Sequence, residues 1–176
     1  KNGNIKNLYH PEIFNVGYCG DGVYTSTKHP KHYDVWRSML KRVYDKKGEH
    51  YKYYQNIIVC EEWHNFQNFA EWFDNNYKEG FQLDKDILVK RNKVYSPETC
   101  CFVPSEINTL LIKRDKLRGE HPVGVGFHKP LNKYVSKLSA YGRSRNLGYF
   151  SSVSEAFYVY KEAKETHIKE VANKWR

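Results

Sequence analysis

The C-terminal third of the chain constrains its fold most, because three short strand-like runs precede one long helical pattern. The runs GVGFHK, KYVSKLSAYG and RNLGYF are separated by turn residues. A helix is expected over SVSEAFYVYKEAKETHIKEVANKW, where Ser152 or Ser154 can cap it and Glu155 completes a capping box with Ser152. Residues 123–176 are therefore predicted to form a three-stranded antiparallel sheet packed on one helix. Its expected inner-face residues are Ala156, Val159, Ala163, Ile168, Val171 and Ala172.

The charge of this sheet is one-sided. Between His121 and Phe150 the chain has no acidic residue and five basic ones, namely Lys129, Lys133, Lys137, Arg143 and Arg145. Strand alternation separates Tyr134, Ser136, Leu138 and Ala140 from Lys133, Val135, Lys137 and Ser139. The first set has the smaller residues that can accept the helix, which leaves the lysines on the open face. Such a face can enter a groove of duplex DNA, and the alternative is a solvated face kept soluble by lysine.

The composition of the whole chain favours the same partner. Lys and Arg number 29 and Asp and Glu number 20, which gives a net charge of +9 and favours a polyanion. The sequence contains no apolar run near the roughly 18 residues that span a bilayer and no basic amphipathic helix with a greasy face. Double-stranded DNA is therefore the expected partner, no membrane partner is expected, and the expected location is the cytoplasm. The oligomeric state stays open, with a monomer favoured over an oligomer. The first residues show no secretory signal.

The four cysteines do not form a metal-binding pattern. No C-x-x-C pair occurs, no histidine follows at zinc-finger spacing, and adjacent Cys100 and Cys101 cannot easily share a tetrahedral ion. We expect four reduced thiols and no structural zinc.

Residues 1–112 are predicted to form a separate arm and domain. An irregular arm over 1–33 contains a loose hairpin, and the domain covers 34–112, before a linker over 113–122. One helix should begin at Asp34 and a second should run over 65–76, with a short buried strand over 57–60 between them. His29 and His32 are read as part of a solvated Pro loop, with a metal site as the alternative. The expected buried helix residues are Trp36, Met39, Leu40, Val43, Phe66, Phe69, Ala70 and Phe73.

The stretch 82–111 carries the candidate chemistry. Leu83, Ile87 and Leu88 indicate a first β-run, and residues 91–93 supply turn chemistry. Further extended pieces lead to Pro104, and a helix is expected with Ser105 as its cap. The predicted order is a β-hairpin followed by a helix, with closely spaced carboxylates at Asp84 and Asp86. A purely structural reading makes these two carboxylates turn and cap residues.

Two resemblances sharpen these expectations. The segment GVGFHKPLNKYVSKLSAYGRSRNLGYFSSVSEAFYVYKEAK resembles the APETALA2-type DNA-binding domain, through its G-V start, its lysine-aromatic strand, LG-aromatic-F and E-A-x-x-x-Y. The resemblance implies that the sheet lies in the major groove. The residues implied to contact DNA are Lys133, Lys137 and Ser139, with Arg143, Arg145 or Asn146 from the third strand, and Lys129 adds to the basic set.

The segments YDVWRSMLKRVYD, VCEEWHNFQNFAEWF and LDKDILVKRNKVYSPETCCFVPSEINTLL resemble phage-encoded HNH endonucleases. The resemblance implies an HNH-like ββα core with flanking helices and one divalent metal, Mg²⁺ or Mn²⁺. Asp84 and Asn108 match the metal ligands, Asp86 could add a carboxylate, and Lys85 stands where the family has its general-base His. The chain as a whole is thus predicted to be α+β.

The lysine in the place of the base leaves two functions open. An unperturbed lysine is protonated at neutral pH and does not deprotonate water, so Lys85 is expected to act as a phosphate clamp or a cation near the transition state. In the first function, the protein is a metal-dependent homing-type endonuclease in which His64 or a metal-bound hydroxide replaces the missing base. In the second, catalysis is lost and the protein is a DNA-binding factor. In either case a phage-encoded chain would act in the bacterial cytoplasm.

Overall fold

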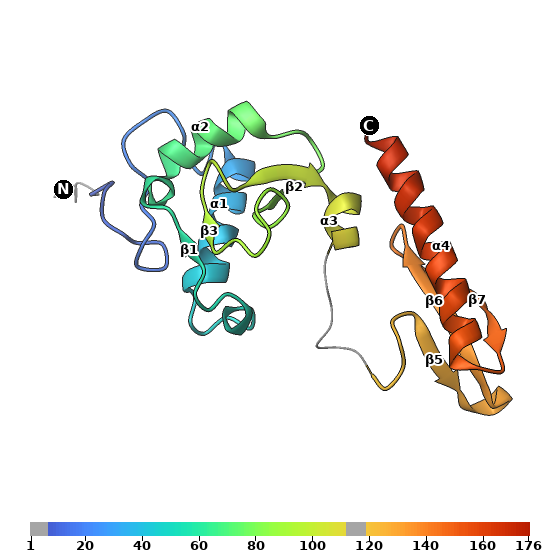
Figure 1. Ribbon diagram of the computed structural model, residues 1–176. Coiled ribbons are helices and arrows are strands. Elements are labelled where there is room, and N and C mark those ends of the chain that lie inside the picture. The colour runs from blue at the N-terminus through green and yellow to red at the C-terminus, as the bar shows by residue number, and fades with distance from the viewer. Residues whose placement is uncertain (1–6, 112–118) are drawn as a thin grey trace. The chain divides into compact units, whose positions relative to one another are not determined.

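A computed structural model of the chain describes residues 7–111 and 119–176, and these residues form a mixed α+β structure (Figure 1). The contacts divide the chain into two compact units, Lys1–Pro104 and Ser105–Arg176. The sequence predicts a boundary after residue 112, whereas helix α3, Ser105–Leu111, groups with the second unit. The predicted linker falls largely on residues 112–118, which lie outside the described residues.

The first unit is built around helix α1, Pro30–Tyr44, and helix α2, Phe66–Asn76 (Figure 1). The prediction that α1 begins at Asp34 is wrong, because the helix begins one turn earlier with His29 at the N-cap. Proline suits the first helical turn, where its missing N–H needs no partner and its fixed φ is already helical. The side chain of Asn65 caps α2 by accepting a hydrogen bond from the backbone N–H of Gln67 at 3.0 Å.

All eight predicted helix core positions of this unit are buried. The two apolar stripes meet in one aromatic-rich cluster, in which the indole N–H of Trp36 donates to the carbonyl oxygen of Trp63 at 2.7 Å. The cluster contains Trp36, Met39, Leu40, Val43, Val59, Trp63, Phe66, Phe69, Ala70, Phe73, Tyr95, Cys100 and Phe102. Burial of this much aromatic surface is the main stabilisation of the unit.

Short extended pieces complete the unit. In the N-terminal arm, an antiparallel bridge joins Ile13 to Gly17. The 3₁₀ helices are η1, Tyr51–Tyr53, and η2, Glu61–His64. Strand β1, Ile58–Val59, pairs in parallel with β3, Val94–Tyr95. The predicted buried strand over 57–60 is thus shorter than expected, and Ile58 is 53% exposed.

Strand β2, Phe81–Asp84, pairs antiparallel with β4, Cys101–Pro104, and β4 continues directly into α3. Two antiparallel strands therefore precede the helix, but the predicted hairpin with its turn at residues 91–93 is wrong, because β3 follows that turn and pairs with β1. The prediction that Ile87 and Leu88 belong to the first strand is wrong. The carboxylate of Asp84 accepts hydrogen bonds from the backbone N–H groups of Asp86 and Ile87, both at 2.8 Å, and these bonds turn the chain out of the strand.

The second unit contains the predicted sheet and helix. Strands β5, Val125–His128, β6, Lys133–Ala140, and β7, Arg143–Phe150, form an antiparallel sheet in that order. The 3₁₀ helix η4, Lys129–Leu131, joins the first two strands. Helix α4, Val153–Lys174, lies along one face of the sheet (Figure 1).

The capping box between Ser152 and Glu155 is present at the start of α4, as predicted. Its inner face is only partly as predicted, because Ile168 and Ala172 are exposed while His167 is buried. The inner face of α4 runs through Ala163 and His167. Successive residues of an α-helix are turned by about 100° from one another, so Ile168, which directly follows His167, points away from that face.

At the other end of α4, the Glu106 carboxylate accepts hydrogen bonds from Lys174 Nζ at 2.8 Å and Trp175 Nε1 at 3.0 Å. These bonds fasten α3 to α4.

The register of β7 has one irregularity that decides which side chains it presents. A two-residue turn at Tyr141 and Gly142, with φ of 51° and 72°, joins β6 to β7 and pairs Ala140 with Arg143. Ser136 then pairs with Gly148 but Lys137 pairs with Asn146, so Leu147 is the extra residue of a β-bulge. The alternation of β7 therefore reverses at residue 147.

Candidate nucleic-acid interface

The open face of the sheet, opposite α4, can be assigned from the register because directly paired residues point to the same side. Leu138 is 7% exposed and lines one hollow together with Ala163 and His167 of α4, so the even positions of β6 face the helix. Lys133, Lys137 and Ser139 lie on the other side and are exposed, as predicted. The open face, as defined by this register, consists of His128, Lys133, Val135, Lys137, Ser139, Ser144, Asn146 and Tyr149.

A pair of rings occupies the middle of the open face. The rings of His128 and Tyr149 have centroids 5.0 Å apart, although their strands lie on opposite sides of β6. Both rings must therefore lean over β6, and they cover Val135, which is only 5% exposed. The Nδ1 atom of His128 is buried and has no hydrogen-bond partner within the described residues. The sequence prediction named neither ring, because it considered only basic, hydroxyl and amide side chains as DNA contacts.

The register that follows the two-residue turn divides the residues that the sequence proposed for DNA contact, because Arg145 and Asn146 are adjacent and lie on opposite faces. Asn146 pairs with Lys137 and lies on the open face. Arg145 pairs with Leu138 and Arg143 with Ala140, so both arginines lie on the helix side of the sheet, where they line a hollow of about 780 Å³ along α4. Lys129 is exposed in η4, at the end of the sheet. The described open face has two lysines and no acidic side chain.

In the first unit, Lys85 is buried rather than presented to a ligand. It is 7% exposed, and its ammonium donates hydrogen bonds to the Asp86 carboxylate at 2.7 Å and to the carbonyl oxygen of Asn92 at 3.0 Å. The side-chain amide of Asn92 donates in return to the carbonyl oxygens of Lys85 and Val94. These reciprocal bonds close the base of the loop 86–91, so the geometry gives Lys85 a structural role.

Asp84 and Asp86, the two carboxylates next to Lys85, do not fit a divalent-metal site. One carboxylate oxygen of Asp84 already accepts two backbone N–H groups. The carboxylate of Asp86 is paired with an ammonium, whose charge opposes that of a cation at the same place. Asn108 lies in α3, which groups with the second unit, whereas Asp84 ends β2 of the first unit. Among the described residues, no group of three or more His, Cys, Asp or Glu is arranged to hold a metal ion.

The predicted replacement base, His64, is half-buried at the end of η2 in the first unit. Its Nε2 atom lies 3.2 Å from the carbonyl oxygen of Val59, and its ring packs edge-on against Tyr44.

All four cysteines are free thiols, and burial raises the pKa of the Cys100 thiol to about 12. That thiol is therefore protonated at neutral pH.

A polar cluster joins the arm, α1 and α2. Tyr24 donates a hydrogen bond to Asp74 at 2.7 Å, and His32 Nε2 lies 2.6 Å from the other carboxylate oxygen. Partial burial opposes the ionisation of Asp74, but the bonds from His32 and Tyr24 outweigh it and hold the pKa of Asp74 below its ordinary value. The hydrogen bond to Asp74 raises the pKa of Tyr24 to about 12. The Nδ1 atom of His29 accepts from the backbone N–H of Thr25, so these histidines belong to the start of α1 rather than to a solvated loop.

No protein-family model matches the chain, and no curated protein or solved structure is similar to it at a significant level. Within the described ranges, 7–111 and 119–176, none of the helices combines the length and the apolar character needed to cross a membrane.

Proposed function

We propose that this protein binds double-stranded DNA with the open face of its C-terminal sheet. The observation that carries the proposal is the combination, on one described face, of Lys133 and Lys137 with no acidic residue. The two lysines are four residues apart on one strand, so about 13 Å separates their backbone positions, which is close to the width of the major groove and suits contacts to the phosphates that border it. The resemblance of this segment to the APETALA2-type domain supports the same partner and a major-groove position.

The side chains of the open face are suited to different kinds of contact with DNA. Lys133 and Lys137 neutralise phosphates, and release of the counterions supplies affinity. Asn146 and Ser139 offer hydrogen bonds to base edges, since amides and hydroxyls pair with adenine and with other bases in the major groove. The rings of His128 and Tyr149 provide an apolar platform between the cations. Arg143 and Arg145 are not assigned to base contacts.

The test is the salt dependence of DNA affinity in the variant Lys133→Gln/Lys137→Gln. If each lysine neutralises one phosphate, the slope of log K against log salt falls in magnitude by about 1.8. The control Lys161→Gln/Lys169→Gln removes two exposed lysines of α4 and should leave the slope unchanged. An unchanged slope in the sheet variant would remove the open face from the interface.

We further propose that the protein acts without cleaving DNA. The support is the buried position of Lys85, whose side chain donates hydrogen bonds to Asp86 and Asn92 at the place where the HNH family has its base. A lysine held in this way is not a mobile phosphate clamp.

The metal-dependent endonuclease is the second candidate function. The strand–strand–helix order of β2, β4 and α3, with Asp84 at the end of β2, favours it. The test is incubation with plasmid DNA and Mg²⁺ or Mn²⁺. Cleavage that is abolished in both Asp84→Ala and Asn108→Ala would establish the nuclease, and its absence in wild type together with its absence in Lys85→His would leave DNA binding alone.

A further inference from the structure

The loop 86–91 in the first unit has a rigid base and an exposed tip, which is an unusual combination. Three reciprocal bonds between Lys85 and Asn92 or Asp86 close the base, and the Asp84 carboxylate fixes the first turn of the loop. The cation of Lys85 also lies 6.0 Å from the ring centroid of Tyr95, a core residue. The loop is therefore anchored to the hydrophobic core at its base.

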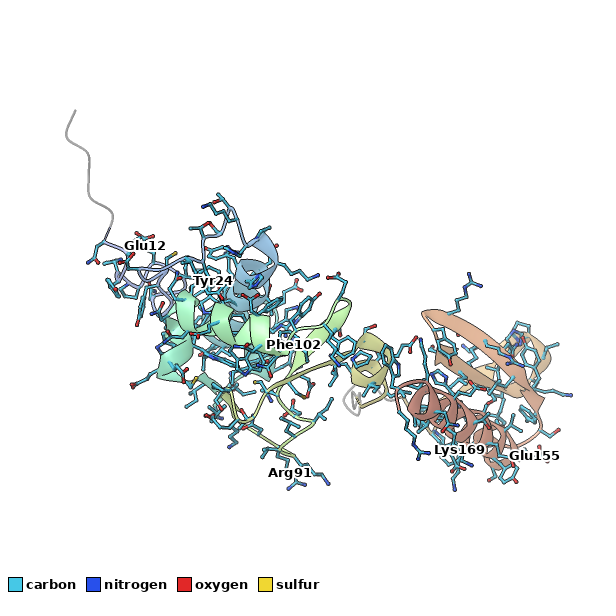
Figure 2. All side chains as sticks on the ribbon, turned by 90° about the horizontal axis from the view of Figure 1, so that it is seen from above. Glu12, Tyr24, Arg91, Phe102, Glu155 and Lys169 are labelled. Carbon is cyan, nitrogen blue, oxygen red and sulfur yellow. The ribbon has the colours of Figure 1, made fainter. Side chains whose placement is uncertain are left out.

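The tip carries apolar and cationic residues together. Leu88 and Val89 are 55% and 46% exposed, and Lys90 and Arg91 follow them directly. Figure 2 shows the labelled Arg91 at the outer end of the loop, away from the labelled core residue Phe102. Arg91 has a φ of 63°, in the left-handed region, so the surrounding bonds hold it in a conformation that costs a non-glycine residue about 1 kcal/mol or more.

The charge of the loop is more positive toward its tip than its composition suggests. The one acid, Asp86, is paired with the ammonium of Lys85 at 2.7 Å. Lys90 and Arg91 are exposed and have no ion-pair partner among the described residues, and exposed Lys93 follows the loop two residues later. The whole segment 1–104 has 15 basic and 13 acidic residues, a net charge of 15 − 13 = +2. Positive charge is thus concentrated at this loop relative to the unit that carries it.

We infer that the loop 86–91 is a second DNA-contacting element, which places Leu88 and Val89 against the minor groove while Lys90 and Arg91 contact the flanking phosphates. Minor-groove proteins insert apolar wedges between base steps and use arginine beside them. A wedge must keep its shape when it enters, and a base closed by buried hydrogen bonds lowers the cost of ordering it. A second copy of the chain is a poorer occupant, because two such tips would bring like charges together.

This inference rests on the proposed function in one respect, since the sheet supplies affinity for the same duplex. The experiment therefore separates the two surfaces. The full chain is titrated onto a duplex of about 30 base pairs with a dye at each end, so that anisotropy gives affinity and energy transfer gives the bend. The titrations run from about 50 to 200 mM salt.

Three variants are compared with wild type and with Lys161→Gln/Lys169→Gln. Leu88→Ser/Val89→Ser removes the wedge and keeps the charge. Lys90→Gln/Arg91→Asn removes the charge, with asparagine chosen because it tolerates the left-handed region. Lys133→Gln/Lys137→Gln removes the sheet contacts. Both loop variants change exposed side chains, and an unchanged far-UV circular dichroism spectrum will verify their folding.

The expected results differ between the variants. Wild type bends the duplex by some 20° or more, and the wedge variant loses this bend while it retains its salt slope. The charge variant lowers the slope by about 1.8. A wedge variant that bends DNA as wild type does, or a charge variant with the wild-type slope, overturns the inference and leaves the sheet-face proposal standing. If only the sheet variant behaves as wild type, the proposed function fails and the loop contact stands. Self-association of wild type that the wedge variant lacks would also overturn the inference, because it would assign the tip to a second copy of the chain.

Discussion

Replacing Lys85 with alanine tests whether this residue serves structure or chemistry. The side chain is 8% exposed, so the change removes three buried methylenes, worth about 0.8 kcal/mol each. It also leaves the carbonyl oxygen of Asn92 without its donor, at about 1–3 kcal/mol. The pair with Asp86, whose side chain is 56% exposed, adds at most about 1 kcal/mol. Relief of the buried ammonium offsets part of this sum, and we expect a loss of about 3 kcal/mol.

The assay is urea unfolding of the full chain followed by tryptophan fluorescence. Three of the four tryptophans, Trp36, Trp63 and Trp72, lie in the first unit, so the signal reports mainly that unit. The matched control Lys85→Met keeps most of the apolar stem and loses the ammonium, and it should lose about half as much stability.

The two roles of Lys85 predict opposite outcomes. If Lys85 closes the base of the loop 86–91, Lys85→Ala should have a lower urea midpoint, and it should also change any DNA bending that depends on this loop. A phosphate clamp predicts unchanged stability and weaker binding. An unfolding free energy for Lys85→Ala within about 0.5 kcal/mol of wild type, the range of ordinary surface changes, would refute the structural assignment.

Three further predictions concern contacts within each of the two units taken separately. Asp74→Asn should lower the urea midpoint above about pH 5, and the difference from wild type should vanish as the pH falls through the depressed folded pKa of Asp74, because protonation neutralises the carboxylate that Tyr24 and His32 contact; a pH-independent difference would contradict this. Gly124→Ala should destabilise the second unit by about 2 kcal/mol or more in a thermal melt, since a Cβ there would lie 2.0 Å from the Tyr160 ring at a φ of +79°, and an unchanged melting temperature would argue against the packing. Asn65→Ala should cost about 1 kcal/mol of unfolding free energy through loss of the α2 cap, whereas Asn65→Ser should cost less.

Local periodicity was sufficient to predict most of the elements. The spacing of Trp36, Met39, Leu40 and Val43 gave α1 its buried stripe, and the Ser152–Glu155 pair gave α4 its start. These signals lie within one or two helical turns, so the sequence contains them completely. The start of α1 was misplaced because Asp34 looks like a cap, whereas Pro30 initiates the helix earlier.

The candidate sites were harder to predict, because they depend on contacts across a loop and on the register between strands, and neither follows from local periodicity. Nothing in the pattern DKDILVKRN says that Lys85 turns inward to Asn92, and a lysine is usually exposed. The faces of β7 depend on a bulge at Leu147, which strict alternation does not anticipate. The sequence prediction grouped Arg143 and Arg145 with Asn146 without a register for β7, and the observed pairing puts the arginines and Asn146 on opposite faces.

The two-residue turn at Tyr141 and Gly142 has a consequence for recognition. It leaves eight residues of β7 to pair with seven of β6, and the bulge takes up the excess. A three-residue turn from the same sequence would remove the bulge and slip the first half of β7 by one residue, which would turn Arg145 and Leu147 toward the open face and Ser144 and Asn146 away from it. The two-residue turn, in which Gly142 adopts a φ of 72°, thus determines which side chains of β7 lie on the open face, although the turn itself lies at the end of the sheet.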